Sequence, residues 1–264
     1  MICVKIRGIG KIKIQMDISK MIKNLLSKFM KPKKINLAYS TDIHSHLLPN
    51  IDDGVNTLEQ SIEIIKKLQE LGFEKLITTP HIMSHRFPNT KQSIKYAYDL
   101  VKNELVKQKI DIDLQYAAEY YFDEYFLDLI EKNDLLTFGD NFILFELSYH
   151  NKPLQLEQAV YKLIKNGYKP VLAHPERYRY YSTNDDYRRL KDMGLYFQIN
   201  SISTEGFYGK TAKKSVSKII DLSYVDFIGS DIHNSKYFDS YKKSLNNKLY
   251  NYILNKNNIK NNII

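Results

Sequence analysis

The sequence predicts an α/β protein in which parallel strands form a closed or nearly closed (β/α) barrel with helices outside. Seven short apolar runs alternate with amphipathic stretches of helical spacing, which is typical of repeated βα units. Each run ends at or just before a His, Asp, Glu or Asn. The chemistry of such barrels lies at the carboxyl ends of the strands, so we expect these residues to meet there. An open doubly wound sheet is the alternative, and it would gather ligands at one switch point only.

The strands are expected to lead into a row of polar residues, in chain order. These are the Asp42-Ile43-His44-Ser45-His46 cluster, His81, Glu119, Glu146, His174, Asn200, and the pair Asp231 and His233.

The first helix is expected between Thr57 and Gly72. Thr57 and Gln60 have the spacing of a capping box, and Gly72 is a suitable C-terminal stop. Apolar residues between them recur at helical spacing. Further helices are predicted from Thr90 to Lys107, Tyr121 to Lys132, Leu154 to Asn166, Asp185 to Met193 and Thr211 to Leu222.

The charge is concentrated in an N-terminal arm. Residues 1–40 carry a charge of +9, which is the net charge of the whole chain, so the remainder is neutral and argues against a nucleic-acid-binding domain. We therefore predict a basic arm over residues 1–37 and one catalytic domain over 38–240. Residues 241–264, rich in Asn and Lys, are expected to form a tail or a last helix.

Within the arm, apolar residues at helical spacing face away from lysines. Such a basic amphipathic helix fits an anionic membrane surface, and a helix packed on the barrel bottom or a disordered leader is the alternative. No apolar run is long enough to span a bilayer, and no secretory signal is recognisable. The apolar residues are Ile18, Met21, Ile22, Leu25, Leu26 and Phe29.

The single cysteine, Cys3, excludes a disulfide within the chain and suits a reducing cytoplasm. It also excludes a thiolate phosphatase loop, because Ile9 stands where that loop needs an Arg. We expect a cytoplasmic protein that the arm can place at the inner face of the membrane.

The strand-end residues provide a mixed imidazole and carboxylate set, which suits Mn²⁺, Fe or Zn²⁺ better than Ca²⁺ or Mg²⁺. The set exceeds the needs of one ion and matches two or three ions joined by bridging carboxylates. Three divalent ions against four carboxylates would leave a positive site that attracts phosphate and makes hydroxide at neutral pH. The candidate ligands are His44, His46, Asp53, His81, Glu119, Glu146, His174, Asp231 and His233.

Residues around this set have expected roles. Asp42 is expected to orient a ligand histidine, and Asn200 to do likewise or only to end its strand. Arg177 follows His174 and is expected to clamp a phosphate bidentately, with a local ion pair as the alternative. His85 and His150 are expected at the surface or rim. Six tyrosines are candidates for stacking on an aromatic substrate, although most tyrosines are expected to pack: Tyr120, Tyr121, Tyr178, Tyr180, Tyr181 and Tyr208.

Five segments together resemble the polymerase-and-histidinol-phosphatase superfamily. More narrowly, they resemble the manganese-dependent tyrosine-protein phosphatases of bacterial capsule and exopolysaccharide operons. The segments span about residues 41–235 and are Asp42 to Gly54, Thr79-Pro80-His81, Ala118-Glu119, Ala173 to Tyr178, and Gly229 to His233.

This resemblance implies a distorted (β/α)₇ barrel with a three-metal centre made by the nine candidate ligands. It also implies that Arg177 binds the phosphate and that the partner is a tyrosine autokinase with a tyrosine-rich tail. Two positions depart from the family pattern: Lys236 lies near the place of a usual Arg after His233, without its bidentate geometry, and Asn50 replaces a Gly.

We therefore predict a protein-tyrosine phosphatase in which metal-bound hydroxide attacks phosphorus and Arg177 holds the phosphoryl group. Asp53 or Asp231 would assist protonation of the leaving group. A small-molecule phosphatase of histidinol-phosphatase type and a non-catalytic metal-binding docking module are the alternatives.

Overall fold

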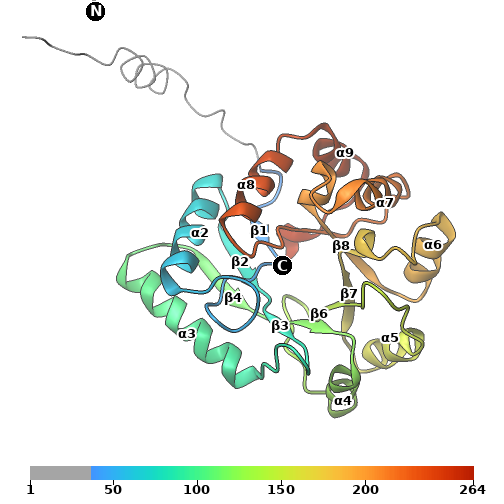
Figure 1. Cartoon of the computed structure of the whole chain (residues 1–264), viewed down its shortest axis with the longest axis horizontal. Helices are drawn as coiled ribbons and strands as arrows, with labels where there is room; N and C mark the ends of the chain where they lie inside the picture. The colour runs from blue at the N-terminus through green and yellow to red at the C-terminus, as the bar shows by residue number, and fades with distance from the viewer. Residues whose placement is uncertain (1–36) are drawn as a thin grey trace, which may run out of the picture. The chain divides into compact units, whose positions relative to one another are not determined.

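The computed structural model describes residues 37–264, which form one compact unit, and the predicted amphipathic helix of the arm lies outside the described residues. Within residues 37–264, no helix is both long and apolar enough to cross a membrane. Strands lie at the centre of this unit and helices lie outside them (Figure 1). The strands are β1 Thr41–Asp42, β2 Lys75–Thr78, β3 His81–Ile82, β4 Asp113–Tyr116, β5 Glu119–Tyr121, β6 Phe142–Glu146, β7 Lys169–Ala173, β8 Tyr196–Asn200 and β9 Phe227–Gly229. The α-helices are α2 Leu58–Leu71, α3 Lys91–Lys107, α4 Glu124–Lys132, α5 Leu156–Lys165, α6 Asn184–Asp192, α7 Gly209–Asp221, α8 Ser235–Ser244 and α9 Lys248–Lys256.

All named strands pair in parallel. One sheet has the order β1-β2-β4 and the other the order β3-β5-β6-β7-β8-β9. Two of the seven predicted runs are each divided into two strands, at Thr79-Pro80 and at Ala117-Ala118, which separates the sheets. Backbone bonds still cross the divisions, from Ala117 N to Thr78 O and from Glu119 N to Pro80 O. The strand order is sequential in both sheets, so the described residues contain no switch point of the doubly wound kind.

The ends of β1 and β9 also meet. Ser45 and Ile232 form a parallel bridge, His46 N donates to Ile232 O, and Asp231 N donates to His44 O. Below this bridge the amide of Asn261 fills the gap between the two strands, donating to Thr41 O and Ile228 O and accepting from Ile228 N. A side chain here replaces the direct hydrogen bonds of a sheet.

The helix predictions hold with small shifts at the ends. Thr57 caps α2 and Gly72 ends it in the left-handed conformation, while Gln60 Oε1 accepts from Asn56 N, one residue before the cap. One prediction was wrong at its start, because Tyr121 belongs to β5 and Asp123 caps α4. The predicted boundary at residue 240 falls inside α8, and the last segment contains α9 and the buried Asn261. The compact unit therefore extends to the C-terminus.

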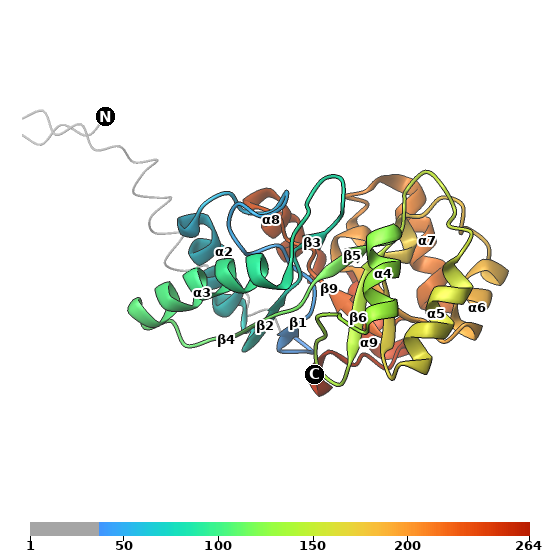
Figure 2. The same ribbon diagram turned by 90° about the horizontal axis from the view of Figure 1, so that it is seen from below.

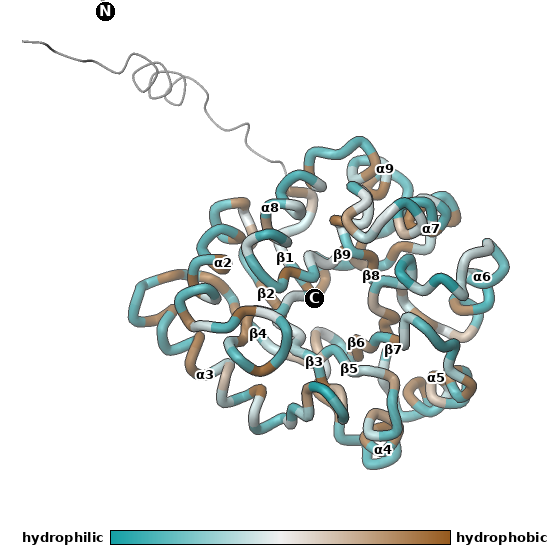
Figure 3. The backbone as a smooth tube through the Cα atoms, viewed as in Figure 1, coloured by the Kyte–Doolittle hydropathy of each residue, from teal (hydrophilic) through white to brown (hydrophobic). Residues whose placement is uncertain are grey.

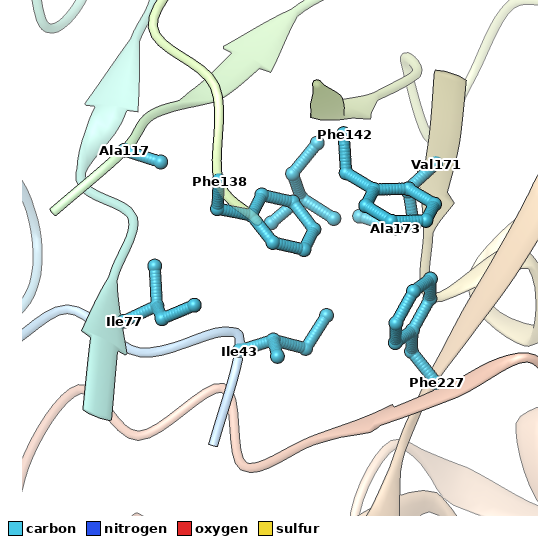
Figure 4. Packing of buried hydrophobic residues seen from close by; sticks show 9 residues of the cluster. Ile43, Ile77, Ala117, Phe138, Phe142, Val171, Ala173 and Phe227 are labelled. Atoms are coloured by element: carbon cyan, nitrogen blue, oxygen red, sulfur yellow. The ribbon is translucent and has the colours of Figure 1, made fainter. Parts of the chain in front are cut away.

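The core lies among the strands. Apolar segments in Figure 3 coincide with the strands and with parts of the helices, and polar segments with many outer loops. In Figure 4 Phe138, Phe142 and Phe227 lie close together with Ile43 and Ile77. The C-terminal Ile264 packs against this cluster, and in Figure 2 the C-terminus lies at one end of the strands.

The core sets the position of the polar strand ends. Alternate strand residues share a face, so a residue two positions beyond a core side chain lies on the same side of its strand. Core residues Leu144 and Ala117 stand in this relation to Glu146 and Glu119. The packed interior therefore supports a polar layer at the carboxyl ends of the strands.

Candidate metal centre

All nine predicted ligands lie together at the carboxyl ends of the strands. They form four groups whose ligand atoms lie within 4.8 Å of one another. Four of the residues, His44, His46, His81 and Glu119, each belong to two groups, which is the arrangement expected around adjacent ions. The groups are His46, Asp53, His81 and His233; His44, His46 and Asp231; His44, Glu119 and His174; and His81, Glu119 and Glu146.

Glu119 occupies the middle of the set. Its Oε2 lies 3.2 Å from His44 Nε2, 3.4 Å from His46 Nε2 and 3.3 Å from His81 Nδ1. Its Oε1 lies 3.0 Å from His174 Nε2. A buried carboxylate that faces four imidazoles is suited to bridge two cations.

The His81 ring tests whether the set fits metal ions. Its Nδ1 is buried and has no hydrogen-bond partner among residues 37–264, yet Glu119 Oε2 and Glu146 Oε1 each lie 3.3 Å away. A buried nitrogen without a partner is costly unless something else satisfies it. A divalent cation between these three atoms would do so, and the donors present therefore fit a metal.

Burial and mutual charge shift the pKa values of the cluster. Burial by itself raises the pKa of Glu119 and Asp231, but the histidine rings around them hold both well below the usual range. Burial disfavours protonated His44, yet Glu119 and Asp231 raise its pKa to about 9. Burial and the charge of Glu119 raise the pKa of Glu146 to about 7. Without cations the cluster must therefore hold protons, which bound ions would displace.

A set of residues behind the ligands fixes the ring orientations. Asp52 Oδ2 lies 2.8 Å from His46 Nδ1, and Gln198 Oε1 lies 2.7 Å from His44 Nδ1. Such partners hold the opposite ring nitrogen toward a metal. Sequence reasoning missed both; the adjacent Asp52-Asp53 doublet was the available signal for the first, and the inward alternation along β8 for the second.

The role predicted for Asp42 was wrong. Its carboxylate accepts from Ser230 N at 3.0 Å and from Ser230 Oγ at 2.5 Å, and it makes no hydrogen bond to a histidine ring of the described residues. Asp42 therefore fixes the backbone before Asp231. Asn200 does contact a candidate ligand, because its Nδ2 donates to Asp231 Oδ2 at 2.5 Å.

Close backbone packing allows these contacts. A Cβ on Gly54 would lie 2.4 Å from His46 O, and one on Gly229 would lie 2.5 Å from Gln198 Nε2. Asn50, the departure from the family pattern, has φ of 60°, the left-handed conformation that asparagine tolerates. The loop from Asn50 to Gly54 can therefore fold back over His46.

Arg177 lies beside the cluster, held between two tyrosine rings. Its guanidinium carbon is 4.5 Å from the Tyr149 ring centroid and 4.1 Å from that of Tyr208. Its Nη1 lies 3.4 Å from Asp231 Oδ2. His174, at φ 35°, turns the chain into the short helix that contains Arg177. The stacked guanidinium is suited to hold an anion beside the candidate ions.

The other predicted contacts have mixed outcomes. Lys236 is exposed, with its Nζ 5.9 Å from the Phe207 ring centroid, and within residues 37–264 it makes no ion pair with the cluster. Arg86, which sequence reasoning missed, has Nη2 3.3 Å from Asp53 Oδ2. His85 and His150 are exposed, as predicted. Stacking on a substrate was the wrong expectation for the buried Tyr120, Tyr178 and Tyr181.

Comparison with known proteins identifies similar chains. The sequence matches the profile of a family described as capsular polysaccharide synthesis, CpsB/CapC, over residues 40–253. It is 33% identical over 198 residues to tyrosine-protein phosphatase YwqE of Bacillus subtilis, covering 74% of this chain and 78% of that protein. It is 30% identical over 200 residues to tyrosine-protein phosphatase CpsB of Streptococcus pneumoniae, covering 73% and 82%.

A solved structure is also similar. It comes from the crystal structures of B. subtilis YwqE and S. pneumoniae CpsB, described there as unique metal-dependent tyrosine phosphatases. The TM-score is 0.69 at 28% identity, and the match covers 83% of this chain and 96% of that chain.

Proposed function

The chain belongs to the CpsB/CapC family of capsular polysaccharide synthesis, and from this membership we propose that it is a metal-dependent protein-tyrosine phosphatase. The observation that carries the proposal is the meeting of nine histidine and carboxylate side chains beside a stacked arginine. The named relatives are tyrosine-protein phosphatases, and the similar solved structure is of metal-dependent ones.

We propose that the nine residues bind two or three Mn²⁺ ions, with Fe or Zn²⁺ as the competing metals. Mixed imidazole and carboxylate sets suit these ions, and the sharing of Glu119 and His81 between groups supports more than one ion. When bound, the ions would supply charge stabilisation and an activated water for hydrolysis of a phosphate ester.

The chain's own side chains would position the substrate. Arg177 would hold the phosphoryl oxygens, and Tyr149 and Tyr208 limit its rotation by stacking. Imidazoles hold the pKa of Asp53 and Asp231 below the usual range, although burial opposes this. That favours both residues as metal ligands over the predicted role in protonating the leaving group. A phenol such as tyrosine, with a pKa of about 10, needs little such help.

We also propose that the two sheets form one distorted (β/α)₇ barrel. The sequential strand order, the backbone bonds that link the two sheets and the bridge between Ser45 and Ile232 support closure. A cyclic path of strands would account for ligands that come from almost every strand end.

The substrate protein that we propose is a tyrosine autokinase controlling capsule or exopolysaccharide synthesis, in the cytoplasm. The family description supports the process, and the single cysteine suits a reducing compartment. We propose that residues 1–37 touch the membrane surface. Deletion of this arm should reduce binding to anionic liposomes, and unchanged binding would contradict the membrane role.

The function is tested by phosphate release from a phosphotyrosine peptide and from histidinol phosphate. Metal-stripped protein is assayed with and without Mn²⁺, beside a His44→Ala, His46→Ala variant. We expect Mn²⁺-dependent turnover of the peptide that the variant loses. Turnover of histidinol phosphate alone would indicate a small-molecule phosphatase, and bound metal without any turnover would indicate a docking module.

A further inference from the structure

A pocket of about 440 Å³ adjoins the candidate metal centre. Its wall includes Tyr149, Arg177 and Tyr208, together with Arg179 and Lys210. Nothing in the proposed hydrolysis uses the last two residues.

The pocket and the centre share a wall. Tyr149 Oη lies 3.2 Å from Glu146 Oε2, and Tyr208 Oη lies 2.9 Å from Asp231 Oδ2. Arg177, stacked between these two rings, also contacts Asp231. A group bound in the pocket would therefore lie next to a phosphate held by Arg177.

The pocket is basic. Arg179 and Lys210 are exposed, and neither forms an ion pair with another residue between 37 and 264. The one acid in the wall is Glu176, which is buried and accepts from Asn200 N and Ser203 Oγ through Oε1. The two exposed cations therefore face the pocket without a partner from the described chain.

Helix α7 adds to the positive character. It begins at Gly209, and Tyr208 at its N-cap makes no side-chain capping bond. In the described part of the chain, the backbone N–H groups of Lys210 and Thr211 have no hydrogen-bond partner, and both residues line the pocket. Free N–H groups at the start of a helix favour anions.

We propose that this pocket is a subsite for an anionic side chain of the substrate peptide, close in sequence to the phosphotyrosine. The inference rests on the proposed function and specifies the class of peptide that it acts on. The anion is a carboxylate or the phosphate of a second phosphotyrosine, since Arg179, Lys210 and the α7 N–H groups would bind either. The tyrosine stack would hold the first phosphate and the pocket its neighbour.

The test compares kcat/KM for four substrates: phosphotyrosine amide, a peptide with neutral flanks, peptides with glutamates on either side of the phosphotyrosine, and a peptide carrying a non-hydrolysable phosphotyrosine analogue nearby. The variant is Arg179→Gln, Lys210→Gln. The matched control is Lys132→Gln, Lys165→Gln, two exposed lysines on α4 and α5 with the same loss of charge.

We expect the unaltered protein to favour an anionic peptide over the neutral one by roughly three- to tenfold, mainly through KM. The pocket variant should lose this preference, keep its activity on the amide and the neutral peptide, and differ from the control. The favoured peptide identifies the anion. Equal activity on all peptides, or a preference that survives in the variant, would overturn the subsite. Failure to hydrolyse any phosphotyrosine substrate would instead overturn the proposed function.

Discussion

His46 Nδ1 lies 2.8 Å from Asp52 Oδ2, and this contact fixes which ring nitrogen of His46 faces the centre. Asp52 also accepts from His81 N and Gly54 N, so one buried carboxylate organises two candidate ligands and their loop. Its pKa remains below the usual value, because His46 and His81 offset the effect of burial.

Replacing Asp52 should weaken metal binding without removing a ligand. We expect Asp52→Asn to lower the affinity for Mn²⁺ by about tenfold to hundredfold, since such outer partners orient the ligands. Titration of metal-stripped protein with Mn²⁺, followed by activity and by calorimetry, measures this. Asp140→Asn, at an exposed aspartate that pairs with Lys169, is the control. Equal Mn²⁺ affinities in the two variants would contradict the role of Asp52.

Metal binding should release protons at pH 7. His44 has a pKa raised to about 9 in the metal-free cluster, where burial is outweighed by Glu119 and Asp231, so its imidazole is protonated at pH 7. A ligand imidazole must be neutral, and therefore Mn²⁺ displaces at least this proton. Calorimetry in buffers of different ionisation enthalpy counts the protons. Because the group loses its proton as pH rises through about 9, the release should decline above that pH. Binding without proton release at pH 7 would show that His44 is already neutral.

Tyr208 has two separable contacts, a ring against Arg177 and a hydroxyl on Asp231. We expect Tyr208→Phe, which keeps the ring, to retain most of the activity. Tyr208→Leu should raise KM for the phosphotyrosine peptide, because the guanidinium loses a stacking interaction of about 0.5–2 kcal/mol. Steady-state kinetics on both variants checks this. Identical KM values for the two would show that stacking does not position Arg177.

Asn261 should matter for stability although it lies in the last segment. Its amide makes three hydrogen bonds between β1 and β9. We expect Asn261→Ala to lower the free energy of unfolding by about 2–4 kcal/mol, since buried backbone groups lose their partners. Urea unfolding measures the change. Asn251→Ala, at an exposed position of α9, is the control and should have little effect. A loss no larger than the control's would refute the closing role of Asn261.

The sequence by itself determined the residue types that can bind metal and their places at the ends of strands. Apolar runs that end at His81, Glu119, Glu146 and His174 predicted the layer of ligands, because strand ends in repeated βα units share a face. The caps of α2 were equally readable, since capping at Thr57 and the stop at Gly72 depend on near neighbours in the chain.

Only the tertiary structure decided which distant groups meet. The Asp52 and Gln198 contacts, the role of Asp42, the Tyr149–Arg177–Tyr208 stack and the amide of Asn261 all join segments that no local pattern relates. Hydrophobic periodicity fixes the face on which a residue lies, and the packing of whole elements fixes its neighbours. The chemistry was therefore written in local sequence, whereas the support of that chemistry depended on the complete fold.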